Sequence, residues 1–232
     1  MRRLLAASGW ILLGVPVAAT AIEFTPIDRA CEEALALSAL PASMRDRANV
    51  YVWQDDEYVK TITSDGGFHC LVQRNHAQAI IPECISSTGE DSILRGIMTR
   101  AKMVAAGVPD TEAHARVKAL IESGDIKGPS APGVNFMMSA YNRIYAPEAD
   151  RINPVPPHSM FFAPNAEAAV IGGSFPKAIE TKGFPFVVED GLHSYIVTMT
   201  DKSSDSADVV GACRGQIDVD SPFHQEAAEA GS

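Results

Sequence analysis

The sequence predicts an α+β protein in which an N-terminal helix and a helical hairpin pack on an antiparallel sheet. Three observations support this class. Apolar residues recur at helical spacing in "DRACEEALALSAL" and in two further segments, at 91–107 and 110–124. Short runs rich in β-branched and aromatic residues lie between turn residues. The first of these runs follow one another as a meander, which suits an antiparallel sheet.

The first helix is expected to begin at Asp28, which is a good N-cap, and to end before Pro41. "SMRDRA" adds a further helical turn. "NVYVW" and "EYVKTIT" then predict a hairpin around the acidic turn "QDDE". We expect "DGG" at 65–67 to turn the chain into a third strand, "FHCLVQR", beside the second.

Two helices with a short linker form the predicted hairpin. Gly107 is placed to end the helix at 91–107, and Asp110 is the expected N-cap of the next one. The Gly- and Pro-rich part that follows contains apolar runs that predict the remaining strands, "GVNFMMSAY", "SMFFA", "FPFVV" and "HSYIVTMT".

Both ends of the chain differ in composition from the middle. Residues 1–21 combine Arg2 and Arg3, a short apolar run and a final Ala-Thr-Ala, the pattern of a cleaved signal peptide. The apolar run is short for a membrane span and contains glycine and proline. Residues 201–232 are polar and acidic, and we expect them to be mostly disordered. The sequence therefore predicts one globular domain at 22–200.

The negative charge of the chain limits the kinds of partner that it can bind. The formal net charge is −10, and removal of the signal peptide would make it more negative. An acidic surface repels phosphate backbones and anionic lipids, so we expect neither nucleic-acid binding nor membrane binding after signal cleavage. The remaining class is a periplasmic or secreted protein that binds a small molecule or an envelope protein.

Two of the four cysteines, Cys70 and Cys84, lie in "GGFHCLVQRNHAQAIIPECISS". An exported chain meets oxidising conditions, which favours a disulfide between them. A zinc site would need His69, Cys70, His76 and Cys84 together, but adjacent strand residues point to opposite faces. A nucleophilic thiolate needs an unpaired cysteine. We expect Cys84 to follow a turn at Pro82.

The other two cysteines are harder to assign. Cys31 lies on the first helix and Cys213 in the tail, within its one slightly apolar patch, "DVVGACRG". They pair or stay as thiols, since four cysteines allow three connectivities.

His158 and His193 are the candidate catalytic residues. Each opens a predicted strand after a Pro- or Gly-bearing turn, and Asp190 lies just before His193. If the two strands are neighbours, the imidazoles and the carboxylate would form an acid–base or metal-binding cluster at one rim. The alternative is that each imidazole only caps backbone carbonyl groups. No cofactor is indicated by any motif, and no metal site is predicted.

"EALALSALPASMRDRANVYVW", "YVKT", "GFHCLV" and "HSMFFAPN" resemble a family of exported bacterial proteins without an assigned activity. The resemblance covers roughly residues 30–200 and implies no catalytic residues. Two function classes therefore stay open: a non-catalytic exported binding protein, and a hydrolase or metal-dependent enzyme that uses His158 and His193.

Overall fold

The computed structural model describes residues 21–146, 149–181, 183–188, 191–200, 202–204 and 207–219. Its helices are α1 (Arg29–Ser38), α2 (Arg95–Ala105), α3 (Asp110–Glu122), α4 (Ala168–Ile171), α5 (Phe175–Glu180) and α6 (Ala207–Cys213). A 3₁₀ segment at Ala42–Arg47 follows α1, and a π-helical turn at Glu90–Leu94 leads into α2. Of the predicted signal peptide at 1–21, residues 1–20 lie outside the described residues.

An eight-stranded sheet forms the centre of the molecule, with the strand order β2-β1-β3-β4-β5-β8-β10-β9. Its strands are β1 (Ala48–Gln54), β2 (Glu57–Ile62), β3 (Phe68–Gln73), β4 (Ile81–Ser86), β5 (Val134–Met137), β8 (His158–Phe162), β9 (Phe186–Val188) and β10 (Tyr195–Met199). β6 (Arg143–Ala146) and β7 (Arg151–Pro154) form a separate two-stranded hairpin. The predicted α+β class is confirmed.

The sheet is mixed, so the prediction of a wholly antiparallel sheet is wrong. β1 and β2 form the expected hairpin, whose turn residues Asp55 and Asp56 both have positive φ. β3, however, pairs with β1, in parallel, and not with β2. The chain between β2 and β3 therefore crosses the end of β1. Gly66 allows this crossing, because a Cβ atom there would overlap the backbone of Arg47.

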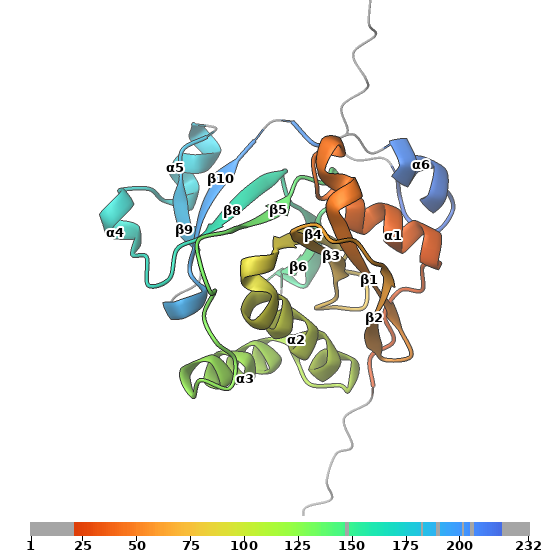
Figure 1. The fold of residues 1–232 in the computed structure, drawn as a ribbon, viewed down its shortest axis with the longest axis horizontal. Coiled ribbons are helices and arrows are strands. Elements are labelled where there is room, and N and C mark those ends of the chain that lie inside the picture. The colour runs from red at the N-terminus through yellow and green to blue at the C-terminus, as the bar shows by residue number, and fades with distance from the viewer. Residues whose placement is uncertain are drawn as a thin grey trace, which may run out of the picture.

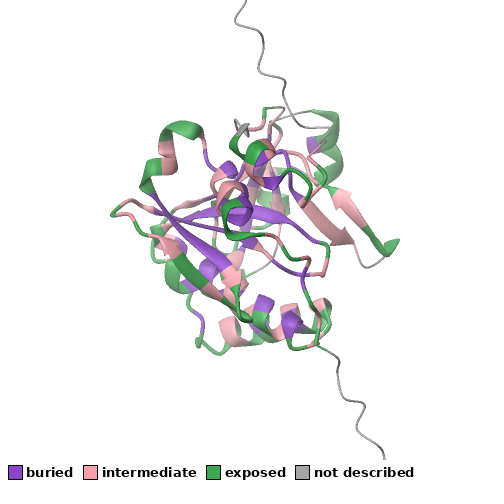
Figure 2. Cartoon of the chain, turned by 90° about the vertical axis from the view of Figure 1, so that its right-hand side faces the viewer, coloured by how far each residue is buried: buried purple, intermediate pink, exposed green. Residues whose placement is uncertain are grey.

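Helices cover both faces of the sheet (Figure 1). α1 and α6 contact each other, and the residues of α1 pack with Val50, Cys70 and Cys84. The opposite face carries Leu71 and Ile85, which pack with residues that precede and begin α2. Figure 2 shows buried residues along the sheet and exposed residues on the outer sides of the helices. Since side chains alternate along each strand, the two faces belong to two separate apolar cores.

The predicted Cys70–Cys84 disulfide is present. The two residues stand directly opposite each other on β3 and β4, with a sulfur–sulfur distance of 1.98 Å. Cys84 lies within a strand, so the expectation of a turn at Pro82 is wrong. Pro82 pairs only with Val72 of β3, because β4 meets β5 later, at Cys84 and Ile85. A proline is tolerated there, since its missing N–H faces no second ladder.

Cys31 and Cys213 form a second disulfide, with a sulfur–sulfur distance of 2.06 Å. Cys213 ends α6, and both cysteines are fully buried together with Val209. Residues 207–219 are therefore structured. The prediction that 201–232 are mostly disordered is wrong for these residues. The apolar residues among them, few as they are, pack on α1 and are held there by a covalent bond.

The α2–α3 hairpin is confirmed, but Asp110 does not cap α3 as expected. Pro109 occupies the N-cap position, and Asp110 is the first helical residue. Its carboxylate accepts two hydrogen bonds from Arg100 of α2, at 2.6 and 2.7 Å. This two-point ion pair fixes the hairpin. Within the described part of the chain, no helix has the length and apolar character needed to cross a membrane.

Candidate functional site: a cleft between the sheet and the helical hairpin

A cleft of about 180 Å³ lies between the sheet and the α2–α3 hairpin. Neighbouring strands supply its floor, because every second residue of each strand faces α2 and α3. The floor residues are Gln73 of β3, Glu83 of β4, Asn135 of β5, Met160 of β8 and Tyr195 of β10. The sheet thus presents a row of side chains that come from distant parts of the sequence.

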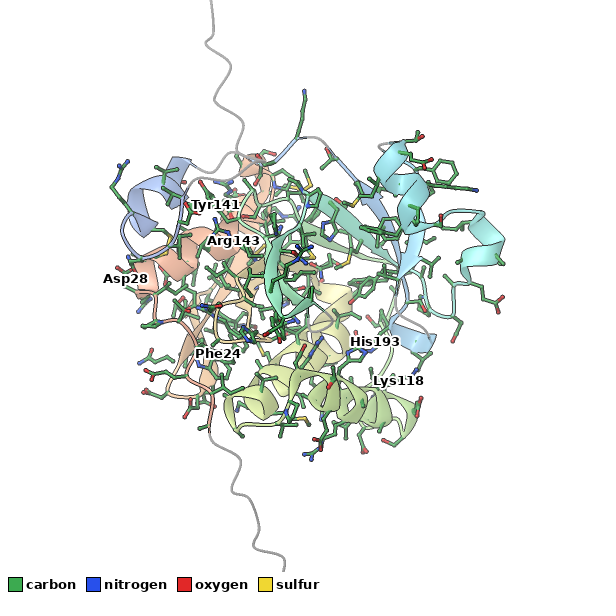
Figure 3. The ribbon with its side chains drawn as sticks, turned by 180° about the vertical axis from the view of Figure 1, so that it is seen from behind. Phe24, Asp28, Lys118, Tyr141, Arg143 and His193 are labelled. Atoms are coloured by element: carbon green, nitrogen blue, oxygen red, sulfur yellow. A yellow bond between two sulfur atoms is a disulfide. The ribbon has the colours of Figure 1, made fainter. Side chains whose placement is uncertain are left out.

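The walls of the cleft combine aliphatic and basic side chains. α2 and α3 provide Ile97, Val117 and Ile121, together with Arg100, His114 and Lys118. His193 closes one end from the turn before β10, and it lies near Lys118 at the edge of α3 (Figure 3). A concave, largely apolar site with a few convergent polar groups is typical of small-molecule binding.

Glu83 is the most unusual residue of the cleft. Its side chain is buried at the centre of an apolar strand, and its Oε2 atom accepts a hydrogen bond of 2.7 Å from Asn135 Nδ2. Glu83 Oε1 and Asn135 Oδ1 have no partner among the described residues. Burial raises the pKa of Glu83 to about 7, against smaller opposing effects of Asn135 and Arg100. A carboxyl group that changes charge near neutral pH is suited to binding or proton transfer.

The structure does not bring His158 and His193 together, although β8 and β10 are neighbours. Because the two strands are antiparallel, His158 pairs with Met199, at the far end of β10 from His193. His158 Nδ1 donates to the carbonyl oxygen of Pro156 at 2.8 Å, and burial lowers the pKa of His158. His193 Nε2 donates to the carbonyl oxygen of Lys127 at 3.0 Å. The expected shared cluster is therefore not formed.

Asp190 lies outside the described residues. His158 lines a separate apolar cavity of about 260 Å³ beside Phe175, Phe186 and Met199. In the part of the chain that the structure describes, no group of three His, Cys, Asp or Glu side chains is arranged to hold a metal ion.

A second polar cluster lies under the start of α2. The hydroxyl of Tyr51 and His69 Nδ1 are 3.1 Å apart, and His69 Nε2 lies 3.5 Å from Glu90 Oε2. Burial lowers the pKa of His69, with Glu90 acting in the opposite direction. Both ring nitrogens therefore have partners within the protein. This cluster is self-contained, whereas two buried acceptor atoms of the Glu83–Asn135 pair have no partner in the part of the chain that the structure describes.

Sequence reasoning missed Glu83 and Asn135, although a signal for Glu83 exists. Glu83 stands in "AIIPECI", where every other residue is apolar or proline. A single carboxylate in such a run is rare unless it is paired or functional. Pro82 predicted a turn directly before Glu83, and a glutamate in an exposed turn is ordinary.

Comparisons of the chain with protein-family models, with curated proteins and with solved structures found no match. The fold defines an α+β protein with a mixed sheet, and the cleft is its candidate functional site.

We expect the stability of the protein to fall as the pH rises through the range in which Glu83 ionises. The folded state keeps a proton on Glu83 up to about pH 7, whereas the unfolded chain releases it near the ordinary pKa of 4.5. The folded state therefore binds more protons between these values, and stability decreases across them. Full ionisation costs about 3 kcal/mol.

Glu83→Gln removes this titration while preserving shape. We expect the unfolding free energy of the variant, measured in urea, to increase relative to that of the parent between about pH 5 and about pH 8. Comparing the two proteins removes the contributions of Glu32, His69 and His158, which also have shifted pKa values. A difference that stays constant over this range would contradict the expectation.

Proposed function

We propose that the chain is an exported, non-catalytic protein that binds a small molecule in the cleft between the sheet and the α2–α3 hairpin. The observation that carries this proposal is the buried Glu83–Asn135 pair: both residues line a cleft with aliphatic walls, and two of their oxygen atoms have no partner among the described residues. Buried polar atoms are normally hydrogen-bonded, so an unsatisfied pair at a cleft is a natural binding position. The two disulfides are compatible with an oxidising compartment.

The size of the cleft limits the ligand. A cleft of about 180 Å³ is at the small end of ligand sites, so it admits a small molecule. A short aliphatic molecule with one polar end fits this volume and the mixture of groups. The ion pair of Arg100 and Asp110 holds the roof, so the cleft is formed before the ligand arrives.

A titration with n-hexanol tests this function without assuming the polar group of the ligand. We expect ¹H–¹⁵N NMR shift changes concentrated at the cleft residues of β4, β5, α2 and α3. Ile121→Trp fills the cleft from α3 and should abolish them. Ala119→Trp adds the same side chain at an exposed α3 position that does not line the cleft, and should leave them unchanged. Scattered shift changes, or equal binding by both variants, would refute the proposal.

A further inference from the structure

We propose that the ligand of the cleft carries a primary amine, whose ammonium group binds between Glu83 Oε1 and Asn135 Oδ1. This inference rests on the proposed function, and it adds the chemical class of the ligand. Its basis is the hydrogen-bond inventory of one pair of buried side chains and the absence, among the described residues, of a cation bonded to Glu83.

A protonated Glu83 has an O–H donor of its own, so the inventory requires a donor from outside the pair when Glu83 is ionised. Glu83 Oε2 accepts the one hydrogen bond that joins the pair, from Asn135 Nδ2. The atoms left over, Glu83 Oε1 and Asn135 Oδ1, are both acceptors when the carboxyl group is ionised. A ligand hydroxyl offers one donor, and a ligand carboxylate offers none. An ammonium group offers three donors, which is enough to reach both oxygens.

An ionised Glu83 favours a cation at its own position in the cleft, while Arg100 and Lys118 line the walls. No ion pair to Glu83 is found among the described residues, and the nearby guanidinium of Arg100 hydrogen-bonds to Asp110 through Nε and Nη2. A buried carboxylate without a bonded counter-ion is unfavourable, which is why Glu83 holds a proton to about pH 7. An ammonium group would supply the counter-ion from the ligand.

Other charged or titratable side chains line the cleft around Glu83. Arg100 comes from α2, His114 and Lys118 from α3, and His193 and Tyr195 from the β10 region. Tyr58 of β2 also interacts electrostatically with Glu83. Lys118 is exposed and so lies at the mouth of the cleft. The aliphatic walls between the mouth and Glu83 suit the chain of a short alkylamine.

The binding of an amine is therefore linked to the proton of Glu83. The amine needs the carboxylate, so its affinity should fall about tenfold for each pH unit below the pKa of about 7. Below that value, amine binding should also release close to one proton for each molecule bound. Calorimetry in two buffers of different ionisation enthalpy measures this release.

The experiment compares n-hexylamine, n-hexanol and n-hexanoate as probes of the disulfide-bonded protein by calorimetry. At about pH 8 we expect n-hexylamine to bind at least about tenfold more tightly than n-hexanol, and n-hexanoate to bind least. The preference should decrease toward about pH 5.5, while n-hexanol binding stays constant. Glu83→Gln should lose both the preference and its pH dependence and keep its affinity for n-hexanol.

Each outcome separates the two proposals. Equal affinity for amine and alcohol at the higher pH, or a preference for n-hexanoate, would overturn the amine assignment and leave small-molecule binding in place. Binding of none of the three probes would overturn both. The comparison of probes on the parent protein decides the question even if the Glu83→Gln variant does not fold.

Discussion

Replacing Cys31 and Cys213 together by alanine should lower the free energy of unfolding by about 5 kcal/mol. The two cysteines are 182 residues apart, and the chain-entropy model predicts that cross-linking so long a loop restricts the unfolded chain strongly. The bond also holds α6 against α1, where Val209 is buried and Val210 and Ala212 pack against the same cluster. Urea unfolding followed by the fluorescence of Trp53 measures the loss.

The second disulfide provides a matched control. Cys70 and Cys84 are 14 residues apart, so the same double replacement there should cost about 3 kcal/mol. Both pairs are fully buried, which makes the side-chain losses comparable. A Cys31/Cys213 variant that is as stable as the parent, or no less stable than the Cys70/Cys84 variant, would show that loop length does not govern stability here.

Replacing Glu32 by glutamine should cost about 3–5 kcal/mol, because it leaves a buried guanidinium without its counter-charge. Glu32 of α1 and Arg74, directly after β3, are each 2% exposed, and Arg74 Nη2 lies 3.4 Å from Glu32 Oε1. Burial raises the pKa of Glu32 more than Arg74 lowers it. The same oxygen also accepts a hydrogen bond from the backbone N–H of Trp53, and glutamine can still accept that bond.

The double variant Glu32→Gln/Arg74→Met distinguishes the charge from the packing. Methionine keeps much of the volume of Arg74 and removes the buried charge, so most of the lost stability should return. It also removes Arg74 Nε and Nη1, which have no partner among the described residues. If the double variant is less stable than Glu32→Gln alone, the side chain of Arg74 contributes mainly through contacts that methionine cannot make.

The helices and the first hairpin could be predicted because their signals are local. The Asp28 cap, the spacing of apolar residues in α2 and the acidic turn at Asp55 and Asp56 each lie within a few residues of the element that they define. The order of the strands is not local. The parallel pairing of β1 with β3 requires the chain before β3 to pass close to the backbone of Arg47. In the sequence, only Gly66 indicates this close approach.

The candidate site could be predicted even less. Neighbouring strands were expected to bring His158 and His193 to one rim, but the direction of pairing in β8 and β10 places them at opposite ends. The cleft joins Glu83 to Asn135, which is 52 residues away along the chain. Their contact depends on the pairing of β4 with β5, and the spacing of residues in the sequence does not reveal which strands pair.

The disulfide connectivity has a consequence for the order of oxidation. As the chain emerges from its amino end, Cys31 and then Cys70 become accessible, while the native partner of each follows later. Joining sulfurs in order of emergence would link Cys31 to Cys70, a pairing that the folded protein does not contain. Cys31 has to stay reduced, or be reshuffled, until nearly the whole polypeptide has left the machinery that makes or moves it.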